Sequence, residues 1–219
     1  MDATRRGFLV TIGSAGTLSL AGCAAGDDAE TSAGTNTTAT TTRLRKVHSL
    51  PAPSLGPSDA PVTVEAYEDY ACPHCRRYVE ETLPEIRESY VTADAVRYEH
   101  HDFPIPVDER WSWQVASAAR AVQDSVDAQA FFAFATSIYE HLGSYSLDVI
   151  GSTAAAVGAD PAFVRTAARE ETYRPVLEAD RRRGVERGVR GTPTIFVNGE
   201  KLPSYEWSTV ETAIESALP

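Results

Sequence analysis

The sequence predicts an α/β domain in which a long helical segment separates two regions of strand character. Three observations carry this prediction. A β-type run over residues 62–67 leads directly into the motif Cys72-Pro73-His74-Cys75. Residues 107–188 are rich in alanine and helical patterns without a convincing strand, and strand character returns at residues 194–197. A mixed order of strands and helices of this kind is typical of an α/β fold.

Length and composition allow one domain with a real core plus appendages. The chain has 219 residues, of which 42% are hydrophobic, and its formal net charge is −11, from 31 acidic and 20 basic residues. Only Lys46 and Lys201 are lysines. Because nucleic acid and anionic lipid surfaces attract basic proteins, this balance argues against both as partners. It favours a soluble acidic surface, and it suits a high-salt environment in which self-repulsion is screened.

Residues 1–23 read as an export signal that ends in a lipobox. Arg5-Arg6 precedes a weakly apolar run over residues 8–21, which is too short to span a membrane. The paired arginines resemble a twin-arginine signal, and Leu20-Ala21-Gly22-Cys23 resembles a lipobox with Cys23 as the lipid attachment site. Cleavage before Cys23 removes Arg5, Arg6 and Asp2, so the charge becomes −11 − 2 + 1 = −12. The alternative is an ordinary buried cysteine in an apolar helix.

Residues 24–50 predict a disordered, threonine-rich tether. They consist largely of Ala, Gly, Asp and Thr and include six residues, 37–42, of which five are threonine. Such a composition cannot form a packed core. We therefore expect a domain held by a lipid at a membrane face outside the cytoplasm, where disulfides persist.

The region from residue 60 begins as a βαβ unit. After Cys75, apolar residues recur at Val79, Leu83, Ile86 and Tyr90, with the spacing of one helix face. Pro84 lies inside this helix and should kink it. Residues 95–100 then alternate apolar and polar side chains, which predicts a second strand.

Turn residues divide the rest of the chain. Gly143 and Gly158 predict helix ends, and Asp160-Pro161 predicts a helix start. Asn198-Gly199, which follows the strand at 194–197, is a strong signal for a two-residue hairpin. A last helix is expected from about residue 207 to 218.

The Cys72-Pro73-His74-Cys75 motif at a helix start suits thiol–disulfide exchange. An N-terminal position lets unpaired N–H groups and the helix dipole stabilise a thiolate, so Cys72 is the expected exposed nucleophile. Cys75, one turn further, is the expected resolving thiol. Pro73 fits the first helical turn. A protonated His74 should lower the pKa of Cys72 further, the alternative being a solvent-facing side chain without an electrostatic role.

A metal centre is not expected. Half of a zinc site could come from Cys72 and Cys75, but the chain has no second C-x-x-C motif. His100 and His101 are neighbours on a strand, so they face opposite ways and cannot easily share a metal. They are expected to be ordinary residues at a strand end, and the only cofactor predicted is the redox-active disulfide itself.

Several motifs in a fixed order resemble the DsbA-like branch of the thioredoxin superfamily. They are Tyr67-Glu68-Asp69-Tyr70-Ala71 followed by the cysteine motif, then Leu83-Pro84-Glu85, Asp102-Phe103-Pro104 and Gly188-Val189-Arg190-Gly191-Thr192-Pro193-Thr194. The resemblance runs from about residue 60 to the end. One position departs from it: many thioredoxin-like proteins carry a buried acid six residues before the first cysteine, where this chain has Ala66. Glu65 should face the other way, and Glu68 is expected beyond the strand's end.

The resemblance implies a thioredoxin fold, residues 60–106 and 189–219, with an inserted helical domain over residues 107–188. It implies that Pro193 is a cis-proline lying against the cysteines, with the Thr192 backbone free to pair with substrate; the alternative is a trans proline that opens a strand. The aromatic residues of the insertion then belong to its core rather than to a substrate groove, namely Trp111, Trp113, Phe131, Phe132 and Phe134.

Together these features predict an extracytoplasmic dithiol oxidase that introduces disulfides into exported proteins through Cys72 and Cys75. Its partners would be exported proteins with thiols or disulfides, and a redox partner of unknown identity that resets the pair. A disulfide reductase or isomerase of the same fold is the alternative, since redox poise alone separates them. A non-catalytic thioredoxin-fold binding module or chaperone is a third reading, which the intact cysteines and Pro193 disfavour.

Overall fold

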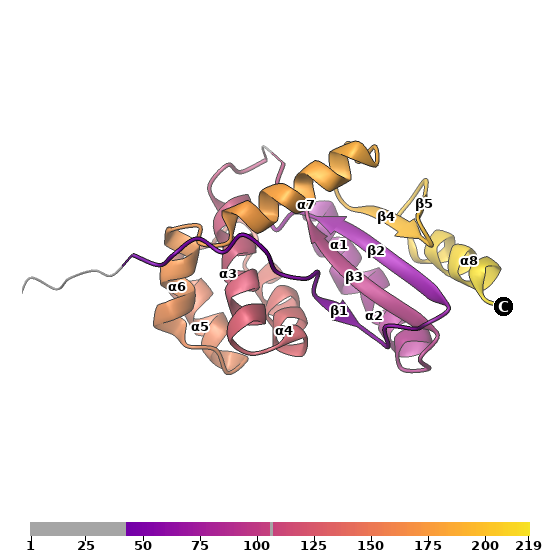
Figure 1. Ribbon diagram of the computed structural model, residues 1–219, viewed down its shortest axis with the longest axis horizontal. Coiled ribbons are helices and arrows are strands. Elements are labelled where there is room, and N and C mark those ends of the chain that lie inside the picture. The colour runs from indigo at the N-terminus through magenta and orange to yellow at the C-terminus, as the bar shows by residue number, and fades with distance from the viewer. Residues whose placement is uncertain (1–42, 106) are drawn as a thin grey trace, which may run out of the picture. The chain divides into compact units, whose positions relative to one another are not determined.

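The computed structural model describes residues 43–105 and 107–219. Its centre is a five-stranded sheet with the order β1-β3-β2-β4-β5 (Figure 1). The strands are β1 (Ser54–Leu55), β2 (Val62–Glu68), β3 (Val96–Asp102), β4 (Thr194–Val197) and β5 (Glu200–Lys201). β2 and β3 are parallel, and the other neighbours are antiparallel. The short edge strand β1 was not predicted.

The βαβ unit is present, and both of its strands are longer than predicted. β2 and β3 pair from Val62 with Val96 to Glu68 with Asp102. His100 and His101 therefore lie inside β3, and both are buried. Their expected position near a strand end is confirmed, since β3 ends at Asp102, but both are buried and therefore differ from ordinary strand-end residues.

The helix after the cysteines is interrupted rather than smoothly kinked. It comprises α1 (Pro73–Arg77), the π-helical segment η1 (Tyr78–Thr82), α2 (Leu83–Ile86) and a second π-helical segment, η2 (Arg87–Val91). The Leu83 N–H donates to the Tyr78 carbonyl in the wide π pattern. Pro84 sits in the first turn of α2, where a missing N–H donor is tolerated. The expected disturbance at Pro84 thus takes the form of a π-turn.

Among the described residues, five helices lie between β3 and β4 in sequence, and α3, α4, α5 and α6 lie together beside the sheet (Figure 1). They are α3 (Trp111–Ser125), α4 (Ala128–Tyr139), α5 (Leu147–Ala156), α6 (Pro161–Arg169) and α7 (Arg174–Glu186). Asp160 caps α6 through the N–H groups of Ala162 and Phe163, as the Asp-Pro signal predicts. Gly143 and Gly158 both follow helix ends with positive φ angles, also as expected.

The aromatic residues of this helical segment divide into two groups. Phe131, Phe132 and Phe134 are buried core residues, as predicted. Trp111 and Trp113 are only partly buried, and each carries an arginine over its ring, with Arg174 3.7 Å from the centre of Trp113. The tryptophans therefore form part of the edge of the core.

Residues 43–50 differ from the predicted disordered tether. The Val47 N–H donates to the Thr172 carbonyl oxygen over 3.0 Å, and the Leu44 N–H donates to Glu170 over 2.9 Å. Leu44, Val47 and Leu50 also pack against the hydrophobic core. These three apolar side chains are spaced three residues apart and pack on the domain. The overall polar composition of residues 24–50 does not indicate this contact. The rest of the predicted tether, residues 24–42, lies outside the described residues.

The two faces of the sheet carry different side chains. One face contributes Val64, Ala66 and Ile195 to the core that includes both active-motif cysteines. The other face is crossed by α7 (Figure 1), which comes so close that a Cβ atom at Gly184 would lie 2.7 Å from Phe103. A glycine at this position therefore permits the packing of α7 on the sheet.

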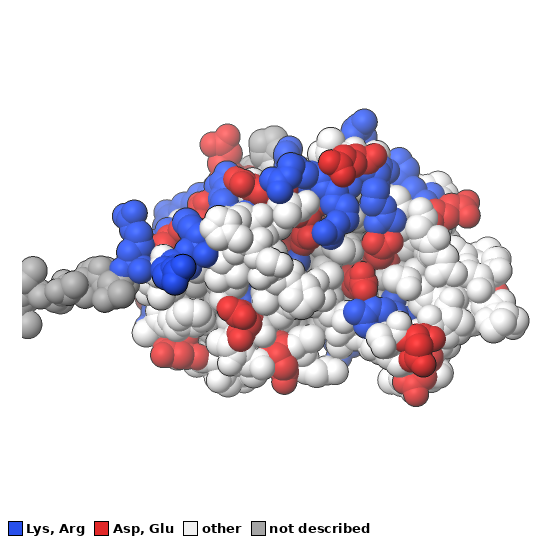
Figure 2. All heavy atoms as spheres, viewed as in Figure 1, with Lys and Arg blue, Asp and Glu red and all other residues white. Residues whose placement is uncertain are grey.

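A buried arginine joins the sheet to the helical segment. Arg120 of α3 is fully buried, and it donates to Asp102 of β3 and to Asp180 of α7, each over 2.6 Å. Buried charges need such partners. On the face drawn in Figure 2, arginine and lysine side chains, with some acidic ones among them, gather along the margin formed by α7 and residues 43–46.

The C-terminal part follows the predicted pattern. β4 and β5 form a hairpin whose two turn residues, Asn198 and Gly199, have φ angles of 46° and 84°. Positive values at both positions are those of a type I′ turn. The last helix, α8 (Trp207–Ala217), packs against β4 and β2.

Candidate active site

The cysteine motif lies at the junction between β2 and α1, as predicted. Cys72 is the N-cap residue of α1 with an extended backbone, Pro73 occupies the first helical turn, and Cys75 lies within the helix. Both cysteines are free thiols. This arrangement directs the unpaired N–H groups of the first turn toward the Cys72 side chain.

Cys72 is more enclosed than expected, since only 4% of its surface is exposed. Its Sγ donates a hydrogen bond to the Thr192 carbonyl oxygen over 3.3 Å. The pKa of Cys72 is lowered to about 5, first by the hydrogen bond from the Cys75 side chain, and then by Thr192 and the backbone N–H groups of Cys75 and His74, against the opposing effect of burial. Cys72 is therefore ionised at neutral pH.

Cys75 has the opposite character. It is fully buried, and burial raises its pKa well above the ordinary value, with the Cys72 side chain and the charge of Glu68 acting in the same direction. Its Sγ accepts a hydrogen bond from the Asp69 N–H over 3.4 Å. The pair thus combines a thiolate at the surface end of the motif with a protonated thiol beneath it, which suits a nucleophile and a resolving thiol.

The Thr192–Pro193 peptide bond is cis, as the resemblance implies. The Thr192 backbone contacts Cys72, although the two residues are 120 positions apart in the sequence. The Thr192 hydroxyl is buried and has no hydrogen-bond partner among the described residues. It is consequently available to the Cys72 thiolate, whose pKa it lowers.

His74 acts differently from the expectation. Its side chain is exposed and its Nδ1 lies 3.1 Å from the hydroxyl of Tyr205. His74 contributes to the lowered pKa of Cys72 through its backbone N–H, after the larger effects of the Cys75 side chain and Thr192, and its imidazole is not among the main causes. Tyr205 was not predicted as a site residue, and the loop that carries it reaches the motif only through the tertiary fold.

The buried acid that appeared to be missing at Ala66 is provided by Glu68. This residue belongs to β2, where Ala66 and Glu68 face the same side, and only 2% of it is exposed. It accepts hydrogen bonds from the Tyr98 hydroxyl and from His100 Nδ1, each over 3.1 Å. The placement of Glu68 beyond the strand's end is wrong, because the pairing with β3 extends through it.

A second buried acid, Asp69, fixes the segment before the cysteines. Its carboxylate accepts from the N–H groups of Ala71 and Ile105 and from the hydroxyl of Ser112 over 2.7–2.9 Å. Burial raises its pKa to about 6. The Tyr139 hydroxyl donates to the Asp69 carbonyl oxygen over 3.2 Å. Since Ser112 and Tyr139 belong to α3 and α4, the helical segment anchors the active motif.

The predicted lipid attachment site, Cys23, and the signal over residues 1–23 lie outside the described residues. Within residues 43–105 and 107–219, no helix is both long and apolar enough to cross a membrane.

Comparisons with known proteins agree with this architecture. The family model described as Thioredoxin matches residues 49–216. The disulfide bond formation protein D of Bacillus subtilis (strain 168) is 24% identical over 173 residues, which cover 76% of this chain and 77% of that protein.

Two solved structures illustrate the similarity of fold. Oxidised BdbD from Bacillus subtilis superimposes with a TM-score of 0.70 at 23% identity, covering 80% of this chain and 98% of that one. DsbA from Chlamydia trachomatis gives a TM-score of 0.69 at 17% identity, covering 79% and 95%. The thioredoxin fold with an inserted helical segment is therefore confirmed.

Proposed function

The chain belongs to the thioredoxin family and is a protein thiol–disulfide oxidoreductase, and from this premise we propose that it acts outside the cytoplasm as a dithiol oxidase of exported proteins. The observation that carries the direction of the reaction is the difference in acidity between Cys72 and Cys75. A Cys72 thiolate stabilised in the folded protein favours the reduced pair, which makes the disulfide form oxidising.

The proposed reaction begins with the Cys72–Cys75 disulfide. A client thiolate attacks Cys72 Sγ, the bond between the two cysteines breaks, and Cys75 leaves and takes up a proton. A second client thiolate then attacks the client sulfur of the mixed disulfide, and Cys72 leaves as a thiolate. The client loses two electrons and gains a disulfide, while the cysteine pair becomes reduced.

The residues around the pair have separate roles in this scheme. The low pKa of Cys72 makes it a good leaving group in the second step. Glu68, whose charge acts on the Cys75 thiol, is the buried acid that assists the proton change at Cys75. The extended Thr192 backbone opposite Cys72 offers a pairing edge for the client segment.

A groove beside Pro193 supports the binding of an extended client. It has a volume of about 310 Å³, and its lining includes Arg190, Gly191, Pro193, Lys201 and Tyr205. Exported client proteins with thiols are the proposed substrates. A redox partner that accepts two electrons from the reduced pair completes the cycle.

We further propose that a lipid on Cys23 anchors the protein to the outer face of the cell membrane. The proposal rests on the twin-arginine-like signal and the lipobox-like Leu20-Ala21-Gly22-Cys23. Mass spectrometry of membrane-extracted protein should find Cys23 as a modified N-terminal residue. A free Cys23 thiol on an uncleaved chain would refute the anchor.

The reduction potential of the Cys72–Cys75 couple, measured in glutathione buffers, tests the oxidase function. An oxidase should have a potential close to about −120 mV, whereas a value near about −270 mV would identify a reductase and overturn the proposed direction. Transfer of a disulfide to a reduced two-cysteine peptide provides the matching activity test. A Cys72→Ser variant that kept this activity would instead favour a binding module or chaperone.

A further inference from the structure

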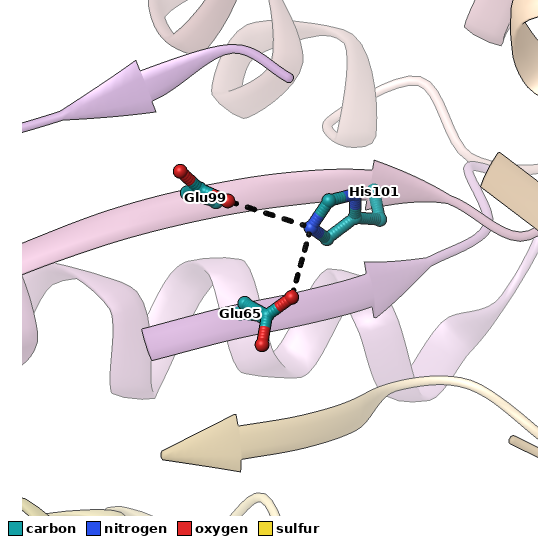
Figure 3. Close-up of side chains that lie close together, drawn as sticks. All are labelled: Glu65, Glu99 and His101. Carbon is teal, nitrogen blue, oxygen red and sulfur yellow. Dashed lines mark ion pairs between the residues drawn. The ribbon is translucent and has the colours of Figure 1, made fainter. Parts of the chain in front are cut away.

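Three side chains gather on the sheet face opposite to the cysteines. Glu65 of β2 and Glu99 of β3 are directly paired across the parallel ladder, and His101 lies two residues beyond Glu99 on the same face. Figure 3 shows the imidazole of His101 directed toward both carboxylates. The candidate ligand atoms of these residues all lie within 4.8 Å of one another.

The imidazole of His101 lacks a hydrogen bond in this position. Only 3% of the residue is exposed, and neither ring nitrogen has a hydrogen-bond partner among the described residues. Its Nε2 lies 3.4 Å from Glu65 Oε1 and 3.8 Å from Glu99 Oε2. These distances are long for hydrogen bonds, and a buried polar group without a partner calls for an explanation.

Arginines hold the two carboxylates in place. Arg187, the C-cap residue of α7, forms a bidentate pair with Glu65 that includes the Oε1 atom facing His101, and Arg97 donates to Glu99 Oε1 over 2.7 Å. The Tyr67 ring stacks on His101 with centroids 4.8 Å apart, and Asp180 lies 3.8 Å from Nδ1. Such contacts orient the ligands and leave Glu99 Oε2 and His101 Nε2 directed toward the shared space, next to Glu65 Oε1.

We propose that Glu65, Glu99 and His101 form a binding site for a divalent transition metal, with Zn²⁺ as the best match. Imidazole nitrogen and carboxylate oxygen are ordinary zinc ligands, with metal–ligand distances of about 2.0–2.2 Å. A tetrahedral centre places two such ligand atoms about 3.3–3.6 Å apart. The separations of 3.4 and 3.8 Å from Nε2 are close to this requirement.

The site has a structural role. The metal binds the neutral Nε2 and draws β2 and β3 together, while Arg187 and Asp180 extend the connection to α7. Alternation along β2 directs Glu65 away from the face that carries the cysteines, so the metal takes no part in thiol chemistry. His100 does not bind this metal together with His101. It lies on the opposite face of the sheet, where it contacts Glu68 and Phe131.

Isothermal titration of the full chain with zinc sulfate tests the site. The protein is used in its disulfide form with Cys23→Ser, so that no thiol competes for zinc. One zinc ion per chain is expected to bind. His101→Gln and Glu99→Gln should each weaken this binding by about tenfold or more, whereas the control His141→Gln should not change it.

A second measurement keeps the test valid if a variant folds poorly. The melting temperature of the unmodified chain should rise with added zinc, and the ring signals of His101 should shift in the nuclear magnetic resonance spectrum while those of His48 stay in place. The absence of saturable binding, or binding unchanged in both variants, would overturn the proposal. Unchanged His101 signals would likewise leave a protonated histidine between two carboxylates as the explanation of the cluster.

Discussion

The Cys72 thiol and the Thr192 carbonyl oxygen lie 3.3 Å apart, although 120 positions separate them in the sequence. The contact places the cis Thr192–Pro193 bond over the reactive end of the cysteine motif. The Thr192 carbonyl, its hydroxyl and the first-turn N–H groups of α1 therefore surround one sulfur atom. The Cys75 thiol, the Thr192 hydroxyl and the backbone N–H groups of Cys75 and His74 lower the pKa of Cys72, and they do so against the opposing effect of burial.

The first prediction concerns ionisation of Cys72 in the reduced protein. The rate of alkylation by iodoacetamide should rise with pH around a midpoint of about 5, the pKa of this thiol. Because this pKa is below that of an unfolded cysteine, the contribution to the stability of the reduced protein is complete above about pH 9 and is lost as the pH falls through 5. A midpoint near 9 would contradict the site geometry.

The second prediction isolates the Thr192 hydroxyl. Thr192→Val keeps the shape of the side chain but removes a donor to the thiolate, so the pKa of Cys72 should rise by about one unit, as expected for a hydrogen bond to a charged group. Thr194→Val is the matched control, since that hydroxyl donates to the Gly191 carbonyl instead. Equal alkylation profiles for Thr192→Val and the unmodified protein would show that the Thr192 hydroxyl does not act on the Cys72 thiolate.

The third prediction concerns Glu68 and the buried thiol. The negative charge of Glu68 raises the pKa of the Cys75 thiol, so Glu68→Gln should lower the pKa of Cys75. The measurement is the pH dependence of Cys75 alkylation in a Cys72→Ser background. Glu85→Gln, a change at an exposed position, serves as the control. If Glu68→Gln and Glu85→Gln had the same midpoint of Cys75 alkylation, Glu68 would have no role in setting the pKa of Cys75.

The fourth prediction tests the anchoring of the active motif by the helical segment. Ser112→Ala removes a fully buried hydroxyl that donates to Asp69 over 2.9 Å. We expect the free energy of unfolding in urea to fall by about 1–3 kcal/mol and the disulfide transfer rate to fall with it. Ser125→Ala, whose hydroxyl bonds only within its own helix, should cost less.

The fifth prediction concerns the buried ion cluster around Arg120. Arg120→Ala leaves Asp102 and Asp180 without their shared partner, and the cost should be about 3–5 kcal/mol in urea unfolding. Arg182→Ala on the exposed side of α7 is the control and should change stability by less than about 0.5 kcal/mol. A small effect of Arg120→Ala would mean that water reaches the two carboxylates.

Much of the architecture could be predicted because its signals are local. Asp160-Pro161 begins α6, Asn198-Gly199 turns the hairpin, and Cys72-Pro73 starts α1, each through chemistry that involves only a few neighbouring residues. The predictions that failed depend on pairing at a distance. Glu68 was placed outside its strand because the length of β2 depends on β3, which begins 28 positions further along.

The sequence by itself determined the redox motif, its position between strand and helix, and the order of the elements around it. These follow from short-range backbone preferences and hydrophobic periodicity, which act within a few residues. Only the tertiary structure decided which groups surround the sulfur atoms: Thr192 above Cys72, Tyr205 beside His74, Glu68 beneath Cys75, and Ser112 holding Asp69. The acidity of a thiol depends on charges, donors and burial within a few ångströms in space, and it is the fold that brings those distant residues together.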